Sequence, residues 1–180
     1  YANIWHYTDR SAANGGPALS PHDDIGDGSK DCTGCLAATS ASGLPTYVPP
    51  GTYLINSNIT LTKNITLAPG AKLKPASGVV VSLLGGYTTE DDNHVFDVSL
   101  GGSVIVGGSG YVTPMHFGAD KTGSTDSLAT IQAMLGCGAS NFNFGKGAFQ
   151  VGGGLTMTSK SNFSIYGSGT LTQTVTLEKT

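Results

Sequence analysis

Residues 117–174 have the sequence FGADKTGSTDSLATIQAMLGCGASNFNFGKGAFQVGGGLTMTSKSNFSIYGSGTLTQT, and this stretch decides the fold. Its first part is a turn rich in glycine and aspartate, which leads into a short segment with the apolar spacing of a helix. Asp126 and Ser127 stand just before that segment, where side-chain oxygens can accept the free N–H groups of a first helical turn. The apolar positions of the predicted helix are Leu128, Ile131, Met134 and Leu135.

Beyond Gly147 the apolar spacing changes to two, which is typical of strands. Each apolar group is too short to fold alone, but short strands of this kind stack as the turns of a solenoid. We therefore expect a mainly all-β fold, in which this stretch begins a parallel stack with a short capping helix. The residues expected to face the interior are Phe149, Val151, Leu155, Ile165 and Leu171.

The same stretch resembles the opening motif of the pectate-lyase-like proteins, which are right-handed parallel β-helices. That motif places FGA, a glycine-aspartate turn and an Ala-Ile-Gln helix ahead of a strand pair with a central glycine. Bacteriophage tailspikes and capsule depolymerases frequently carry it, and secreted polysaccharide lyases and hydrolases carry it too. The matching residues are Phe117, Gly118, Ala119, Gly123, Asp126, Ala129, Ile131, Gln132, Ala133, Phe142, Phe144, Gly147, Phe149 and Val151.

Residues 21–75 repeat this organisation in a weakened form. Asp31 follows Gly28 at the same spacing as Asp126 follows Gly123. Further pairs in the same order are Gly51 with Gly147, Tyr53 with Phe149, and Ile55 with Val151. Such self-similarity at a fixed offset indicates a repeated structural unit.

We divide the chain accordingly into three parts. Residues 21–111 form a first β-rich unit, and residues 112–180 form a second unit that starts the β-helix. The glycine-rich residues 107–110 are the predicted linker between the two units. Residues 1–20 form an aromatic N-terminal segment.

Two interpretations of residues 1–20 stay open. Their aromatic side chains could pack on the first strands of the stack. Alternatively, Trp5 and Tyr7 could dock on another chain or on the virion, because exposed aromatic residues mark interfaces. Since the chain begins at Tyr1 without a methionine, we expect a processed product or a piece of a longer protein.

The composition indicates a surface hydrated by hydroxyls and amides. Charged residues make up 12% of the chain, and 27 residues are glycine; soluble domains typically have about 25% charged residues. Such surfaces suit virion or extracellular proteins and sugar-like ligands. The net charge of −3 argues against nucleic-acid binding. No apolar run approaches the roughly 20 residues of a membrane-spanning helix, so we expect no membrane insertion.

Three cysteines, Cys32, Cys35 and Cys137, are an odd number and do not form a complete disulfide framework. The spacing of Cys32 and Cys35 is that of a redox pair or of half a zinc site. However, neither a second pair nor a pair of histidines completes a metal site, and no thioredoxin-like pattern surrounds them. We expect buried thiols, no metal and no cofactor, which fits assembly in a reducing host cytoplasm.

Glu90, Asp91 and Asp92, with His94 nearby, form an acidic cluster outside any motif. Glycoside hydrolysis needs two carboxylates about 5–10 Å apart, so these three residues are candidate catalytic residues. A solvated turn is the alternative interpretation. Asp120 and Asp126 are expected to accept turn and helix N–H groups instead. A uronate lyase needs cationic clamps, but Arg10 is the one arginine in the chain, so we expect this segment not to be catalytic by itself.

Three functions remain open. The resemblance favours a structural and attachment segment of a homotrimeric tailspike or tail fibre. It would connect other tail or baseplate proteins to a β-helix that binds host surface polysaccharide, and it would act outside the cell as part of the virion. The second possibility is the front part of a capsule or O-antigen depolymerase, either a glycoside hydrolase or a lyase. The third is a non-viral β-helix adhesin.

Overall fold

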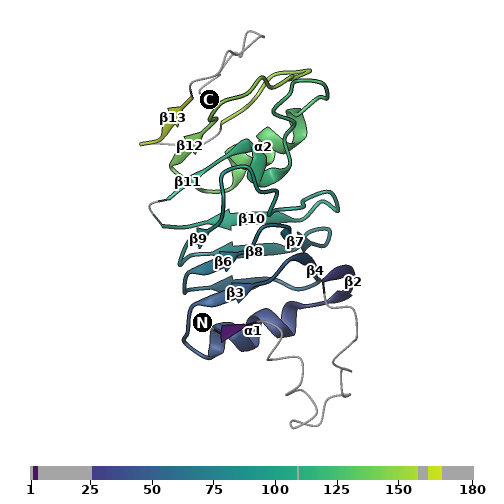
Figure 1. The fold of residues 1–180 in the computed structure, drawn as a ribbon, viewed down its shortest axis with the longest axis vertical. Helices are drawn as coiled ribbons and strands as arrows, with labels where there is room; N and C mark the ends of the chain where they lie inside the picture. Colours follow the sequence, from purple (N-terminus) through teal and green to yellow (C-terminus); the bar gives the residue numbers. More distant parts are fainter. Residues whose placement is uncertain (1, 4–25, 109, 158–161, 168–180) are drawn as a thin grey trace.

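The structure, a computed structural model, describes residues 2–3, 26–108, 110–157 and 162–167 (Figure 1). It has two α-helices, α1 (Thr33–Ala41) and α2 (Leu128–Gly136), and a 3-10 helix η3 (Pro114–Phe117). The mainly β fold is confirmed. The strands are β1 (Ala2–Asn3), β2 (Asp27–Asp31), β3 (Thr46–Val48), β4 (Gly51–Ile55), β5 (Ile59–Leu61), β6 (Ile65–Leu67), β7 (Ala71–Pro75), β8 (Val80–Leu83), β9 (Tyr87–Thr88), β10 (Ser103–Val106), β11 (Tyr111–Val112), β12 (Asn141–Asn143) and β13 (Ser164–Tyr166).

All pairings between these strands are parallel. The sheets have the orders β1-β3-β6-β9, β2-β4-β7, β10-β8-β5 and β11-β12-β13. Consecutive strands β3, β4 and β5 belong to three different sheets, and β6, β7 and β8 return to the same three sheets in the same order. The strands therefore lie in layers along the long axis, from α1 at one end to β13 at the other (Figure 1).

Alternating side chains fill the space between the sheets. In β8 and β10, Val81 and Val104 are paired in register and buried, whereas the next pair, Ser82 and Ile105, faces outward. Full burial of such an aliphatic side chain contributes roughly 1.5–3 kcal/mol. The buried side chains form one hydrophobic cluster, which continues from Cys32 to Met157.

The second unit contains the residues that the sequence predicts to face the interior. The predicted helix is confirmed as α2, with Ile131, Met134 and Leu135 buried. Phe149, Val151 and Leu155 are also buried. These side chains face the interior, as expected from the period of two.

The prediction for Ile165 was wrong, because this side chain is 43% exposed. Ile165 is paired with Phe142, which is in turn paired with Val112, and both of these side chains are buried. Ile165 therefore lies on the inward side of its sheet. However, β13 is the last strand of that sheet in the described part of the chain, and no further strand covers it. Leu171 lies outside the described residues, as do Trp5 and Tyr7.

Glycines mark the places where successive layers approach most closely. A Cβ on Gly85 would lie 2.4 Å from the carbonyl carbon of Lys63, and one on Gly107 would lie 2.9 Å from the Cα of Leu84. The N–H of Gly107 also donates to the carbonyl of Leu83 at 2.9 Å. The first residues of the predicted linker therefore pack against the preceding layer, while the division into two units stays a prediction.

Candidate glycan-binding groove

The sheet β11-β12-β13 presents tyrosine and asparagine side chains on its outer face. Tyr111 is paired with Asn141, and Asn143 is paired with Tyr166. Phe142, between the two asparagines, is fully buried. Because side chains alternate along a strand, both asparagines and both tyrosines lie on the side of the sheet opposite to Phe142.

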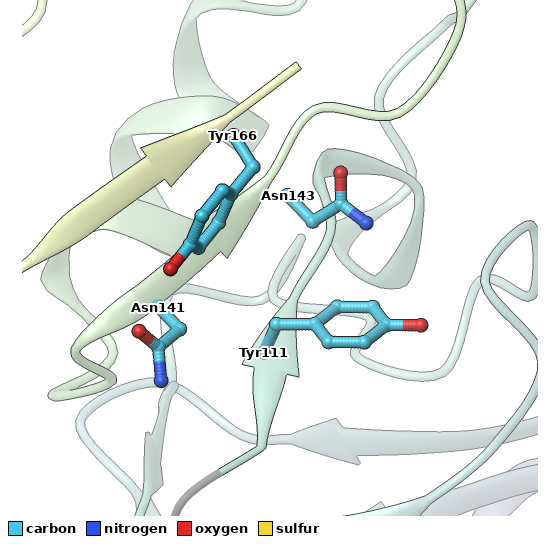
Figure 2. A pocket seen from close by; sticks show the side chains of 4 residues that line it. All are labelled: Tyr111, Asn141, Asn143 and Tyr166. Carbon is cyan, nitrogen blue, oxygen red and sulfur yellow. The ribbon is translucent and has the colours of Figure 1, made fainter. Parts of the chain in front are cut away.

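These four side chains surround a common hollow (Figure 2). Its volume is about 330 Å³, and its lining consists of Tyr111, Asn141, Asn143 and Tyr166. The two rings are open to solvent, with Tyr111 45% exposed and Tyr166 56% exposed. An accessible ring next to amide groups can contact both the apolar and the polar parts of a ligand.

A second hollow of about 220 Å³ shares Tyr111 with the first. It is lined by Asn64 and Tyr87, by Val106, and by the glycines of the turns at 85–86 and 107–110 that the structure describes. Bulkier residues would not fit at Gly85 and Gly107, as the short Cβ distances above show. We call the two hollows together the Tyr111 groove. Among the described residues that line it, none carries a charge.

Asp91 fixes the orientation of Tyr111. The Tyr111 hydroxyl donates to Oδ1 of Asp91 at 2.6 Å, and the Thr113 hydroxyl donates to the Asp91 carbonyl at 2.9 Å. The hydrogen bond to the carboxylate raises the pKa of the Tyr111 hydroxyl, so this ring stays neutral near pH 7. A ring held in this way loses little conformational entropy when a ligand packs on it.

A buried histidine supports the other side of the groove. Nδ1 of His116 accepts the Tyr87 hydroxyl at 2.6 Å and the N–H of Thr113 at 3.2 Å, and Nε2 lies 3.3 Å from the Glu90 carbonyl. Burial lowers the pKa of His116 to about 4, so the imidazole is neutral near pH 7. Two donors at Nδ1 place the remaining proton on Nε2, which donates to Glu90.

The predicted catalytic residues lie on an exposed loop beside this network. Asp91 holds Tyr111, Asp92 forms an ion pair with Lys121, and Glu90 contributes its backbone carbonyl. None of the three lines either hollow. Nε2 of His94 lies 3.2 Å from the carbonyl oxygen of Phe96. The observed contacts of the three acidic residues hold the loop in place. A catalytic role for them stays a prediction.

Asp120 organises the turn before α2. Its two carboxylate oxygens accept the N–H groups of Thr122, Ser124 and Thr125 at 2.8–3.0 Å. The hydroxyls of the same three residues also donate to it. These hydrogen bonds hold the pKa of Asp120 far below its usual range. Asp120 thus has the turn-forming role predicted for it.

The remaining residues of the opening motif also have structural contacts. The side-chain amide of Gln132 donates to the carbonyl of Thr156 at 2.8 Å and accepts its N–H at 2.9 Å. Phe117 and Ala119 are buried. Gly118 has a φ of 84°, and a Cβ there would lie 2.7 Å from the His94 ring.

Glycines of the motif allow close contact between neighbouring layers in both units. Gly123 has a φ of 72° and lies against Ala148, while a Cβ on Gly147 would lie 3.0 Å from the carbonyl oxygen of Lys121. In the first unit, a Cβ on Gly51 would lie 2.9 Å from the Gly26 carbonyl oxygen. Tyr53 is fully buried, and its hydroxyl donates to the Pro49 carbonyl at 3.0 Å.

Three further features are the cysteines, the residue types that bind metals, and the length of the α-helices. Cys32, Cys35 and Cys137 are buried and form no disulfide in the structure. The described residues contain no group of three or more histidine, cysteine, aspartate or glutamate side chains placed to hold a metal ion. Neither α-helix in this part of the chain has the length and apolar character needed to cross a bilayer.

The comparisons with family models, curated proteins and solved structures give no match for this chain. The assignment of these residues to a candidate site is therefore based on their geometry alone. Sequence reasoning missed Tyr111, Asn141, Asn143, Tyr166 and the supporting His116. The alternation of Asn141, Phe142 and Asn143 was the available signal, because it marks a strand with one buried and one polar face.

Proposed function

We propose that this chain is a structural and attachment segment of a tailspike or tail fibre, and that its Tyr111 groove binds a neutral glycan on the host surface. The observation that carries the proposal is the uncharged groove of tyrosines and asparagines on the outside of a parallel strand stack. The remainder of a longer parent protein would add further contacts to the same polysaccharide.

The strand order supports a right-handed parallel β-helix as the architecture of this segment. Each third strand returns to the same sheet, from β3 to β6 to β9 and from β5 to β8. This is the order of a chain that coils around a common interior. Roughly 98% of connections between parallel strands of one sheet are right-handed, which favours that hand here.

A homotrimer is the assembly that this proposal implies. Leu84, Leu100 and Ile105 are 52%, 43% and 40% exposed, respectively, and exposed apolar side chains of this size suit a partner surface. Three shafts side by side would bury such residues and form a rigid rod. The other partners would be tail or baseplate proteins of the virion, with assembly in the host cytoplasm and action outside the cell.

The chemistry of the groove favours a sugar without charge. One face of a pyranose ring carries C–H groups that pack on an exposed aromatic ring, as Tyr111 and Tyr166 offer. Sugar hydroxyls both donate and accept hydrogen bonds, and the amides of Asn141 and Asn143 do the same. Two hollows that meet at Tyr111 suit a chain of sugar units rather than a single sugar.

Calorimetric titration with bacterial surface polysaccharides, neutral and acidic, tests the proposal. We expect binding of at least one neutral polysaccharide, and loss of most of it in the double variant Tyr111→Ala, Tyr166→Ala. Tyr47→Ala is the matched control, because Tyr47 is partly exposed in β3, a strand that does not line the groove. Equal loss in the control, or binding of acidic chains only, would count against the groove.

A reducing-end assay on the same mixtures separates attachment from depolymerisation. The proposal predicts binding without new reducing ends from this segment. New reducing ends that disappear in the variants Asp91→Asn or Glu90→Gln would favour the depolymerase instead. Binding by a chain that remains monomeric would favour a non-viral adhesin.

A further inference from the structure

Two cysteines lie at the start of α1, at one end of the strand stack (Figure 1). Cys32 is the residue that caps the N-terminus of α1, and Cys35 is the third residue of the helix. Residues at this spacing lie on the same side of a first helical turn. The two thiols lie close enough to each other that each shifts the pKa of the other. Both are free, with Cys32 1% exposed and Cys35 7% exposed.

The backbone holds the pair in place. The N–H of Cys32 donates to the carbonyl of Leu54 in β4 at 2.7 Å, and the carbonyl of Cys32 accepts the N–H of Leu36 at 3.1 Å. The Cα positions of the two cysteines are therefore set by a helical turn that is anchored to the stack. A disulfide needs two Cα atoms about 4.4–6.8 Å apart, and the rise and radius of an α-helix place Cα atoms three positions apart at about 5 Å.

The second unit shows that the fold does not require thiols at this place. Ser127 caps α2 with φ −102° and ψ 13°, against −105° and 11° for Cys32. Its N–H donates to the carbonyl of Gln150 at 2.8 Å, and its carbonyl accepts the N–H of Ile131 at 2.9 Å, as in the first unit. Thr130 stands where Cys35 stands.

Hydroxyls thus fill both positions in one unit and thiols fill them in the other. The hydroxyl of Ser127 accepts the N–H of Asp120 at 3.0 Å, and that of Thr130 donates to the Ser127 carbonyl at 2.9 Å. In the first unit the two thiols instead shift each other's pKa, which places them next to each other. What the thiols add is the ability to form a covalent bond.

The surroundings also distinguish the two sulfurs. The hydrogen bond from the Cys32 thiol lowers the pKa of Cys35, although burial acts in the opposite direction. The same hydrogen bond, together with burial, raises the pKa of Cys32. Cys35 is also the more exposed of the two. Cys35 is therefore the better attacking group, because the thiolate is the reactive form.

We propose that Cys32 and Cys35 form a reversible disulfide that ties the first turn of α1 when the protein meets an oxidising environment. The oxidant is a small disulfide such as oxidised glutathione. The Cys35 thiolate attacks one of its sulfurs and releases one glutathione thiolate. The Cys32 sulfur, as it loses its proton, then attacks Cys35 and releases the second. Two thiols and one glutathione disulfide become one protein disulfide and two glutathione thiols.

Glutathione redox buffers of increasing oxidised fraction, applied to the folded chain, test this inference. Samples are quenched with acid, unfolded, alkylated and weighed by mass spectrometry. We expect an oxidised form that is lighter by two hydrogens before alkylation and takes up a single alkyl group, at Cys137. Peptide mapping should place the disulfide between Cys32 and Cys35, and added thiol should reverse it.

Two variants keep the test decisive. Cys32→Ser with Cys35→Thr reproduces the side chains of the second unit and should fold without an oxidised form. Cys137→Ser should oxidise like the unchanged chain. Three alkylated thiols at every buffer composition would overturn the proposal. So would a disulfide that includes Cys137, or a lasting adduct with one glutathione.

Discussion

Asp31 and Asp126 make the same two hydrogen bonds, Asp31 ahead of α1 and Asp126 ahead of α2. Oδ1 of Asp126 accepts the N–H of Leu128 at 2.9 Å and the N–H of Gly152 at 3.0 Å. Oδ1 of Asp31 accepts the N–H of Thr33 at 2.9 Å and the N–H of Asn56 at 3.1 Å. Each carboxylate thereby joins the first turn of a helix to the chain segment one layer later.

Removal of this link should destabilise the first unit. We expect Asp31→Ala to lower the free energy of unfolding by about 1 kcal/mol, as does loss of a residue that caps a helix. Urea unfolding curves measure the change. Asp27→Ala is the control, because the Asp27 carboxylate accepts hydrogen bonds locally from Ser29 and is exposed. Equal curves for both variants would show that the link between layers contributes nothing.

The part of the fold that depends on local sequence patterns could be predicted from the sequence. The spacing of glycine, aspartate and apolar residues predicted α2 and the burial of Phe149 and Val151, because each depends on local periodicity. Ile165 shows the limit of this reasoning. A period of two indicates which face a side chain takes, but it does not indicate whether another layer covers that face.

The candidate site could not be predicted in the same way. Tyr111, Asn141 and Tyr166 come from three strands that are far apart in the sequence, and only the parallel register brings them together. Tyrosine and asparagine also carry no motif of their own. The sequence made the acidic cluster a catalytic candidate because glycoside hydrolysis uses carboxylates. In the structure, Asp91 orients Tyr111.

Acid should destabilise the protein through His116. Its pKa is about 4 in the folded chain and about 6.5 when unfolded. The unfolded chain therefore binds the proton first, and stability falls as the pH decreases from about 6.5 to about 4, by up to about 3 kcal/mol. His116→Gln should be less stable at pH 7 but should depend less on pH in this window.

His94 provides the comparison for that measurement. Burial also lowers the pKa of His94, so the sign of its effect is the same, but it is less buried than His116. We expect His94→Gln to remove a smaller part of the pH dependence. Thermal unfolding at several pH values measures both variants. A steeper pH dependence in His116→Gln than in the unchanged chain would contradict the neutral, buried imidazole.

Glycines at the close contacts should not accept a side chain. We expect Gly85→Ala to cost about 2–3 kcal/mol of stability, because its Cβ would overlap the backbone of Lys63. Gly154→Ala should be close to neutral, since nothing lies within 4 Å of a Cβ at that exposed position. Denaturant midpoints of the two variants give the comparison. Similar midpoints would show that the layers are less closely packed at Gly85.

The proposed assembly has a direct test in solution. Sedimentation equilibrium should give three times the chain mass of 18.3 kDa. Leu84→Asp should weaken the assembly, because it places a charge on an exposed apolar position. Ala37→Asp is the control, because Ala37 is exposed on helix α1 and does not lie on the sheet face that carries Ile105. A single-chain mass at all protein concentrations would contradict the homotrimer.

Fluorine NMR of the chain labelled with fluorotyrosine tests the Tyr111 groove most directly. The sequence has seven tyrosines, and single Tyr→Phe variants assign each signal. On addition of a neutral surface oligosaccharide that binds, we predict that the signals of Tyr111 and Tyr166 shift, while those of Tyr47 and the buried Tyr53 stay in place. Binding that leaves the Tyr111 and Tyr166 signals unchanged would contradict the proposed site.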